Sequence, residues 1–127
     1  MLSKDNEPDI SKIIVDCAFK VHTTLGAGLL ESSYEACLAH EMLKRGLKIQ
    51  KQKILPLEYD DIKIDNGYRL DFLVENEIII ELKSCERLLP VHEAQILTYL
   101  KLAKIKTGLL INFNTKLIKD GIKRYSL

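Results

Sequence analysis

Two acidic residues and a lysine near the middle of the chain, Asp71, Glu81 and Lys83, have types and spacing suited to catalysis. They lie in YRLDFLV (68–74) and IIIELK (78–83), two runs of β-forming residues. The intervening Glu75-Asn76-Glu77 predicts a β-hairpin. If those three residues form the turn, Asp71 lies opposite Glu81 on one face of the hairpin. The other face is then apolar and is expected to pack into the core. Its predicted cross-strand pairs are Val74 with Ile78, Phe72 with Ile80, and Leu70 with Leu82.

Placing Asp71 opposite Glu81 is electrostatically unfavourable, because like charges across a strand pair repel, and such pairs are worth ~0.2–1 kcal/mol. A divalent cation between the carboxylates would remove the conflict, and Mg²⁺ or Mn²⁺ prefers such oxygen ligands. Lys83 would follow Glu81 on the same face and could stabilise charge on a phosphoryl group or help to deprotonate water. The alternative is a solvated lattice in which Arg69 and Lys83 neutralise the two acids. A slip of one residue in register would also remove the arrangement.

Hydrophobic periodicity predicts the elements that must position these residues. Helical patterns cover roughly 8–24, 30–46 and 91–104, and strand patterns cover 48–58, 68–74, 78–83 and 107–113. Pro56 is expected at an edge or a bulge. Residues 60–67 are polar and rich in turn formers, and 115–127 fits either a basic strand or a helix. The order ααβββαβ predicts an α/β fold of the α+β variety: a central mixed sheet flanked by helices, with the last strand parallel to a neighbour.

Composition and length narrow the class of protein. The 127 residues predict one domain over 1–127. Lys and Arg total 19 and Asp and Glu total 18, which argues against a polybasic tail binder and an acidic disordered chain. No apolar run reaches the ~18 residues of a membrane span. The start, MLSKDNEPDI, lacks the pattern of a signal peptide. Three widely spaced cysteines make neither a disulfide framework nor a zinc motif, so a cytoplasmic location is expected.

The net charge of +1 is an average over opposed segments. Residues 57–81 carry eight acidic and two basic side chains, whereas 96–127 carry one acidic and seven basic. A cation site beside an anion-binding surface would suit this asymmetry, and so would two solvated surfaces that attract each other. The basic positions that could hold phosphates are Lys101, Lys104, Lys106, Lys116, Lys119, Lys123 and Arg124.

Four sequence elements together resemble a known nuclease superfamily. Asp71 followed by Glu81-Leu82-Lys83 resembles the D…(D/E)xK signature of the PD-(D/E)xK nucleases. The segment 28–34 reads GxxExxY, and 21–31 resembles the opening of the GxxExxY protein family, which is placed near the RecB-like nucleases. The segment 95–99 reads QxxxY on the following helix, as in RecB-like members. The elements occur in the family order over roughly residues 10–115. One departure is that Leu70, not proline, precedes Asp71.

The resemblance implies a restriction-endonuclease-like core and a division of roles among six residues. Asp71 and Glu81 would bind the metal, and Lys83 would assist catalysis. Glu31 would be a third acidic ligand or would position a water on the metal. Gln95 and Tyr99 would contact the nucleic-acid backbone or orient the site, although packing and one hydrogen bond would also explain that pair. The expected function is a nuclease that depends on Mg²⁺ or Mn²⁺ and hydrolyses phosphodiester bonds, with DNA favoured over RNA.

A different class of function remains open, namely a non-catalytic nucleic-acid-binding or protein-interaction module that keeps the nuclease fold. A chain of this size has little room for recognition elements, so a homodimer or a protein partner is expected, without a membrane. Three further residues receive structural interpretations: Tyr34 is expected in the core, and Glu35 on a solvated helix face. His22 flanks an apolar face and is expected to be a structural histidine with its hydrogen bonds satisfied, with metal ligation as the alternative. Cys85 and His92 do not suggest a thiol nucleophile, because nothing in the sequence orients them.

Overall fold

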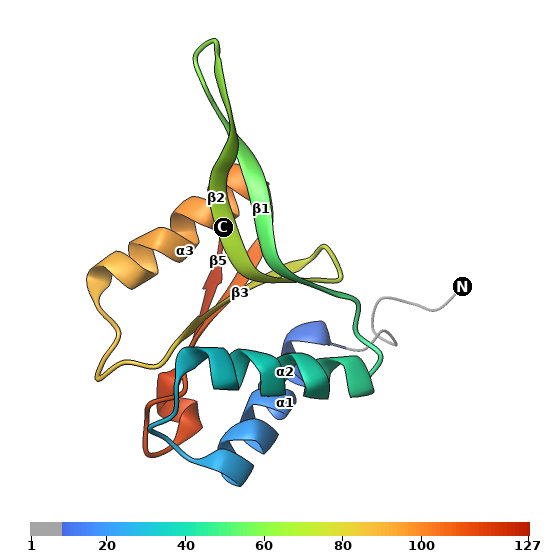
Figure 1. The fold of residues 1–127 in the computed structure, drawn as a ribbon, viewed down its shortest axis with the longest axis vertical. Helices are drawn as coiled ribbons and strands as arrows, with labels where there is room; N and C mark the ends of the chain where they lie inside the picture. The colour runs from blue at the N-terminus through green and yellow to red at the C-terminus, as the bar shows by residue number, and fades with distance from the viewer. Residues whose placement is uncertain (1–8) are drawn as a thin grey trace.

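The computed structural model describes residues 9–127, which form three α-helices and five β-strands (Figure 1). The helices are α1 (Ile10–Leu25), α2 (Glu31–Lys44) and α3 (Pro90–Ala103). The strands are β1 (Ile49–Tyr59), β2 (Ile62–Val74), β3 (Ile78–Lys83), β4 (Thr107–Asn112) and β5 (Ile122–Ser126), with a short 3₁₀ turn (Ile118–Gly121) before β5. The predicted boundaries hold to within two residues for most elements. Residue 8, where the first helix was expected to begin, lies outside the described residues.

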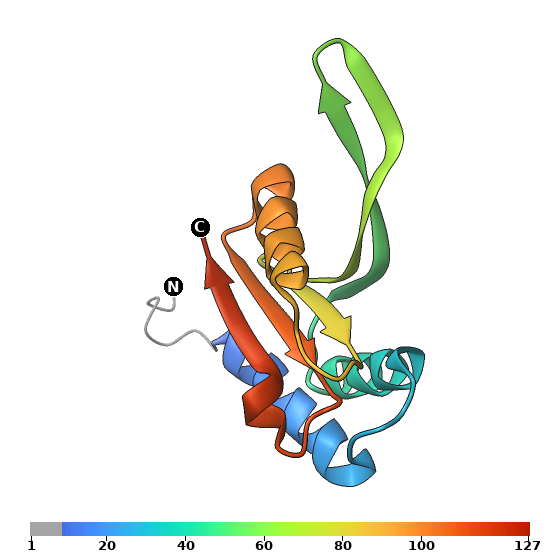
Figure 2. The ribbon, with the colours of Figure 1, turned by 90° about the vertical axis from the view of Figure 1, so that its left-hand side faces the viewer.

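The strands form one mixed sheet in the order β1-β2-β3-β4-β5. All neighbours are antiparallel except β3 and β4, which are parallel and are joined through α3. Helices α1 and α2 pack on one face of the sheet, and α3 packs on the other (Figures 1 and 2). The structure confirms the predicted α+β arrangement with its parallel pair. The segment that the sequence left unassigned, 115–127, contributes the 3₁₀ turn and the edge strand β5.

The larger core lies between the sheet and the pair α1–α2. Apolar residues at three- and four-residue spacing give α1 a buried face, and Asp9 caps its start because its Oδ1 accepts hydrogen bonds from the Ser11 and Lys12 backbone amides. The alternating apolar residues of β2 and β3 meet that face from the sheet. The core contains Ile14, Val21, Tyr34, Leu38, Met42, Phe72, Val74, Ile78, Ile80, Leu82, Leu109 and Phe113.

A smaller core lies under α3 and consists of Leu70, Leu73, Ile79 and Leu100. The prediction that Leu70 shares the face of Phe72 and Val74 is therefore wrong. Strand β1 pairs with β2 as Lys51–Phe72 and as Lys53–Leu70. The residues between these pairs, Gln52 and Asp71, do not form a ladder pair. Leu70 packs on the α3 side and Phe72 on the opposite side, so the simple alternation of β2 does not hold between these two residues.

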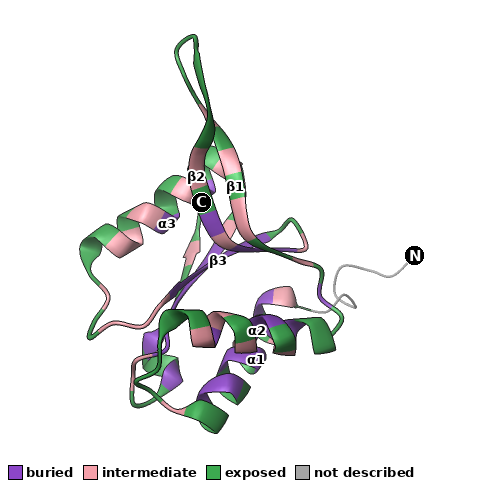
Figure 3. Cartoon of the chain, viewed as in Figure 1, coloured by how far each residue is buried: buried purple, intermediate pink, exposed green. Residues whose placement is uncertain are grey.

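The outer part of the β1–β2 hairpin corrects a second prediction. Residues 60–67 were expected as a polar loop, but most of them extend β2, and the hairpin projects beyond the sheet (Figure 2). Its side chains are mostly exposed on both faces (Figure 3). No one-sided apolar alternation therefore marks the strand in the sequence. The register shifts between Leu55 and Leu57, which places Pro56 at a bulge as predicted.

Candidate active site

Asp71 and Glu81 meet where the β2–β3 ladder ends. The ladder pairs are Val74–Ile78, Leu73–Ile79 and Phe72–Ile80, in the predicted register, and they stop there. The Asp71 backbone N–H then donates to Glu81 Oε2 at 2.8 Å, and the Leu82 N–H donates to Asp71 Oδ2 at 2.8 Å. Each carboxylate thus replaces a backbone acceptor that the partner strand no longer supplies. The expected ladder pairs Leu70–Leu82 and Arg69–Lys83 are not formed.

Burial sets the electrostatics of these two acids. Glu81 is only 4% exposed, and this burial, together with the Asp71 charge, raises its pKa to about 8. Burial also raises the pKa of Asp71, while the hydrogen bond from Leu82 and the Lys83 charge act in the opposite direction. Charged acids are costly in this position, because desolvation and mutual repulsion both penalise the ionised forms. A positive charge close to the two carboxylates would therefore stabilise their ionised forms.

The basic residues nearby do not supply this charge through direct ion pairs with Asp71 or Glu81. Within residues 9–127, neither Arg69 nor Lys83 makes an ion pair within 4.0 Å. The solvated lattice considered as an alternative is therefore not what holds Asp71 and Glu81. Lys83 is half-buried at the end of β3, where its carbonyl oxygen accepts from the Phe113 N–H at 2.9 Å. Its charge lowers the pKa of both acids from a distance.

Glu31 is brought to the site by the loop between α1 and α2. Gly28 has φ +96°, which favours glycine, and allows the chain to turn before α2. The Tyr34 hydroxyl donates to the Gly26 carbonyl at 2.6 Å and accepts from the Leu29 N–H at 3.1 Å. The Leu29 carbonyl in turn accepts from Ser84 Oγ at 2.6 Å, just beyond Lys83. In the GxxExxY segment, the glycine and the tyrosine thus shape the loop that carries the glutamate.

Tyr34 itself is buried, as expected, and stacks on Phe113 with ring centroids 4.6 Å apart. Glu31 is exposed at the first position of α2, and partial burial and then the Asp71 charge raise its pKa. To a smaller extent, the Lys83 charge lowers the pKa of Glu31 and the Glu35 charge raises it. Glu31 therefore lies within electrostatic reach of the two strand acids.

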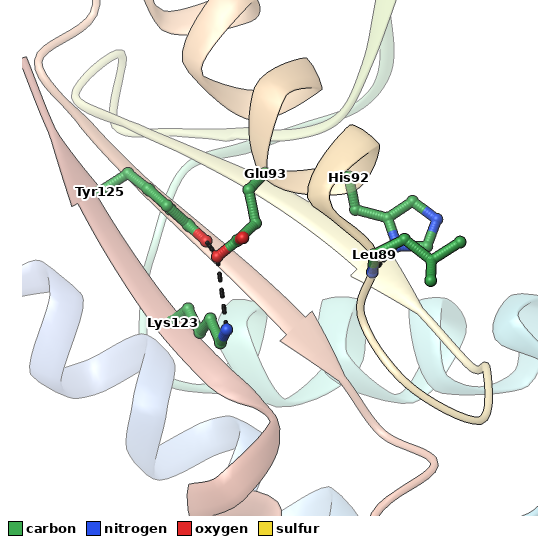
Figure 4. A network of polar contacts seen from close by, with 5 residues as sticks. All are labelled: Leu89, His92, Glu93, Lys123 and Tyr125. Atoms are coloured by element: carbon green, nitrogen blue, oxygen red, sulfur yellow. Dashed lines mark hydrogen bonds and ion pairs between the residues drawn. The ribbon is translucent and has the colours of Figure 1, made fainter.

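Gln95 and Tyr99 are one turn apart on α3, which is fixed at its N-terminal half. Figure 4 shows Glu93 of α3 pointing to β5, where its Oε1 accepts from Lys123 Nζ at 3.3 Å and from the Tyr125 hydroxyl. At the helix start, the Leu89 N–H donates to His92 Nδ1 at 3.0 Å (Figure 4). His92 therefore caps α3.

All six predicted site residues line one open pocket of about 450 Å³. They come from α2, β2, β3 and α3, and the carboxylates of Asp71 and Glu81 lie between the two strands and α3. Three further lining residues were not singled out by the sequence. Asn66 and Tyr68 fall in or beside the segment expected to be a loop, and Ile54 lies in the predicted strand 48–58. The lining is Glu31, Ile54, Asn66, Tyr68, Arg69, Asp71, Glu81, Lys83, Gln95 and Tyr99.

Tyr68 is the most informative of the missed residues. It stacks on Tyr99 with ring centroids 5.2 Å apart and an interplanar angle of 29°. Burial raises the pKa of Tyr99, and the charges of Glu81 and then Asp71 add to the rise, so this hydroxyl stays protonated beside the acids. The stacked pair forms the wall of the pocket between β2 and α3.

Other candidates lie elsewhere. His22 is buried, and its Nε2 makes a hydrogen bond with the Thr115 carbonyl at 2.7 Å, in line with its structural interpretation. None of the seven C-terminal basic positions lines the pocket, and Lys123 and Arg124 are engaged with Glu93 and Ser11. The three cysteines are free. Among residues 9–127, no group of three or more His, Cys, Asp or Glu side chains is arranged to hold a metal ion, and no helix is long and apolar enough to cross a membrane.

Comparison with known proteins agrees with this fold. The family model described as PD-(D/E)XK nuclease superfamily matches residues 8–125. No curated protein and no solved structure matches at the significance required. The chain belongs to the PD-(D/E)XK nuclease superfamily. Membership suggests nuclease activity on nucleic acid, and nucleases of this superfamily generally use divalent metals.

Proposed function

We propose that this chain hydrolyses phosphodiester bonds of nucleic acid in a reaction that requires Mg²⁺ or Mn²⁺. One observation carries the proposal: Asp71, Glu81 and Lys83 line the same pocket as Glu31, Gln95 and Tyr99, although four different elements supply them. DNA is favoured over RNA on the resemblance of the motifs and not on any contact in the pocket. On the same resemblance, we assign the chain to the GxxExxY group near the RecB-like nucleases. From its length and cysteine usage, we propose that it acts in the cytoplasm as one domain over 1–127.

The donor set suits a hard divalent cation. Asp71 and Glu81 each use one oxygen for a backbone N–H, which leaves Asp71 Oδ1 and Glu81 Oε1 as candidate ligands. The raised pKa of Glu81 would fall on metal binding, because the cation favours the ionised carboxylate. When bound, the cation would supply Lewis-acid activation of water and phosphate.

The other residues have separable roles in this proposal. Lys83 places an ammonium near the two acids and stabilises negative charge that develops on the phosphoryl group. Glu31, on the far side of the pocket, orients the attacking water or acts as a third ligand. Gln95 and Tyr99 offer an amide and a protonated hydroxyl as hydrogen-bond donors to the phosphate backbone.

A cleavage assay with two matched lysine variants tests the function. Purified protein is incubated with supercoiled plasmid, linear duplex, single-stranded DNA and RNA, with Mg²⁺, Mn²⁺ or EDTA. Cleavage is expected only with metal, and Lys83→Met is expected to lower the rate roughly 10²–10³-fold. The control is Lys12→Met, which removes an exposed lysine of α1 outside the pocket. Equal rates in wild type and Lys83→Met would overturn the assignment.

The second candidate is a binding module that keeps the fold without cleaving. It is favoured by the lack of a three-ligand metal cluster within residues 9–127 and by the exposure of Glu31. Nucleic-acid binding that is unaffected by EDTA, with intact substrate in every condition above, would select this function.

We propose a second copy of the chain as the partner. The outer hairpin exposes Tyr59 (68%) and Ile62 (59%), and its segment 57–66 has four acidic side chains against one lysine. The basic segment 96–127 has the complementary charge. Light scattering at two salt concentrations distinguishes the states: a dimer mass that falls towards the monomer in high salt is expected, and a monomer in both contradicts the proposal.

A further inference from the structure

Gln52 has a strained backbone in the middle of β1. Its φ is +49°, in the left-handed region that residues other than glycine, asparagine and aspartate seldom adopt. Its strand neighbours pair as Lys51–Phe72 and Lys53–Leu70, so Gln52 stands opposite Asp71 without forming a ladder pair with it. A strained residue of this kind costs roughly 1–3 kcal/mol and persists only where the surroundings hold it. The strain falls opposite one of the two strand acids of the pocket.

The Gln52 side chain links α2 to this strained position. Its Nε2 donates to Glu35 Oε1 at 3.0 Å, and its own Oε1 is buried without a hydrogen-bond partner. A buried amide oxygen without a donor is unfavourable, so packing alone does not account for a glutamine here. Glu35 is half-buried and bonded, so the expectation of a solvated Glu35 is wrong.

Both residues also act on Asp71. Burial has the largest influence on the pKa of Asp71, followed by the Leu82 hydrogen bond and the Lys83 charge. The Glu35 charge then raises this pKa, and the nearby Gln52 amide lowers it. The Gln52 amide therefore lies near two carboxylates at once, while neither Gln52 nor Glu35 lines the pocket.

We propose that Gln52 is a positioning residue, whose left-handed backbone aims its amide between Glu35 and Asp71 and thereby fixes the Asp71 carboxylate for metal binding. The metal-binding part of this inference rests on the proposed function, whereas the positioning of the Asp71 carboxylate does not. Second-layer partners of this kind orient ligands, and their loss typically costs 10–100-fold in metal affinity. A merely structural tie between α2 and β1 would instead affect stability alone.

Gln52→Asn separates these readings, because asparagine adopts the left-handed conformation more readily and is one methylene too short for the contact with Glu35. We expect an unchanged or higher Tm for the metal-free variant, with Mn²⁺ affinity roughly 10-fold lower by calorimetry. The control is Gln50→Asn, an exposed glutamine of the same strand. A lower Tm with unchanged Mn²⁺ affinity would overturn the proposal.

A second readout does not need the metal. Three-bond NMR couplings of Asp71 in metal-free protein should report one side-chain rotamer in wild type and averaging in Gln52→Asn. If wild type binds no Mn²⁺, the proposed function fails, and the couplings still decide the positioning role. Glu35→Ala should reproduce the averaging, and the double variant should be no worse than either single one, because the pair acts as a unit. Unchanged couplings in Gln52→Asn would contradict the inference.

Discussion

Two carboxylates that bond to backbone amides at the end of a strand ladder define the chemistry of the site at the scale of single residues. The Asp71 and Leu82 amides orient Glu81 and Asp71, but neither contact supplies a positive charge. Lys83 is close enough to influence both acids and is not paired with either. The two carboxylates are therefore not held in an ion-pair lattice.

The raised pKa of Glu81 makes a prediction about pH. Its pKa is about 8 in the folded protein and near 4.5 when unfolded, so the folded state binds an extra proton between these values. Stability from this group is present below pH 4.5 and is lost as pH rises through 8. Glu81→Gln should therefore stabilise the metal-free protein more at pH 9 than at pH 5, by more than about 1 kcal/mol, or roughly 3–5 °C in Tm.

Thermal melts in EDTA across pH 5–9 measure this difference. Asp16→Asn, which changes an exposed acid of α1, is the matched control and should leave the pH slope of wild type intact. Parallel pH slopes in wild type and Glu81→Gln would contradict the burial account of the pair.

The chemistry-bearing residues could be predicted from strand alternation and motif spacing, whereas Gln52 and Tyr68 could not. Alternation places Asp71 opposite Glu81 because a hairpin turn fixes the register near it. Gln52 stands opposite Asp71 with a strained backbone that no propensity favours. Tyr68 meets Tyr99 only because β2 and α3 pack together in three dimensions.

At the scale of elements, the α1–α2 loop is the part that the GxxExxY segment explains. Gly28 permits the turn, Tyr34 closes it, and Glu31 begins α2 beside the pocket. The helices of this chain were predictable because one face of each is buried at helical spacing. The central strands β3 and β4 were predictable because a nearly continuous apolar run marks a strand that is buried on both faces. The outer hairpin was not, because exposure on both faces removes the periodic signal.

Tyr34→Phe tests whether the loop positions Glu31. The change keeps the stack on Phe113 and removes the hydroxyl that bonds Gly26 and Leu29. We expect a loss of about 1 kcal/mol in stability and a drop in cleavage rate smaller than that caused by Lys83→Met. Tyr59→Phe, on the exposed hairpin, is the control. A lower Tm with full cleavage activity would show that Glu31 does not depend on this loop.

At the scale of the whole molecule, the sheet and its helices converge on the pocket from both faces. The first turn of α2 lines the pocket from one side of the sheet and α3 from the other, beside the adjacent strands β2 and β3, so acids and donors from distant segments share one opening. The basic C-terminal positions do not line it, which leaves Arg69 and Lys83 as its cations. The acids that share the pocket leave it without an excess of positive charge in the absence of metal, so nucleic-acid binding should be weak and sensitive to salt until a divalent ion is bound.

The most direct measurement is therefore the rate of plasmid cleavage as a function of Mg²⁺ concentration, for wild type and Asp71→Asn side by side. Asparagine keeps the size of Asp71 and removes the charge that would hold the ion. If Asp71 holds the ion, the cleavage rate of wild type saturates with Mg²⁺. The rate of Asp71→Asn is then at least roughly 10²-fold lower at every Mg²⁺ concentration. Equal cleavage by the two proteins, or no cleavage by wild type at any Mg²⁺ concentration, would contradict the proposed function.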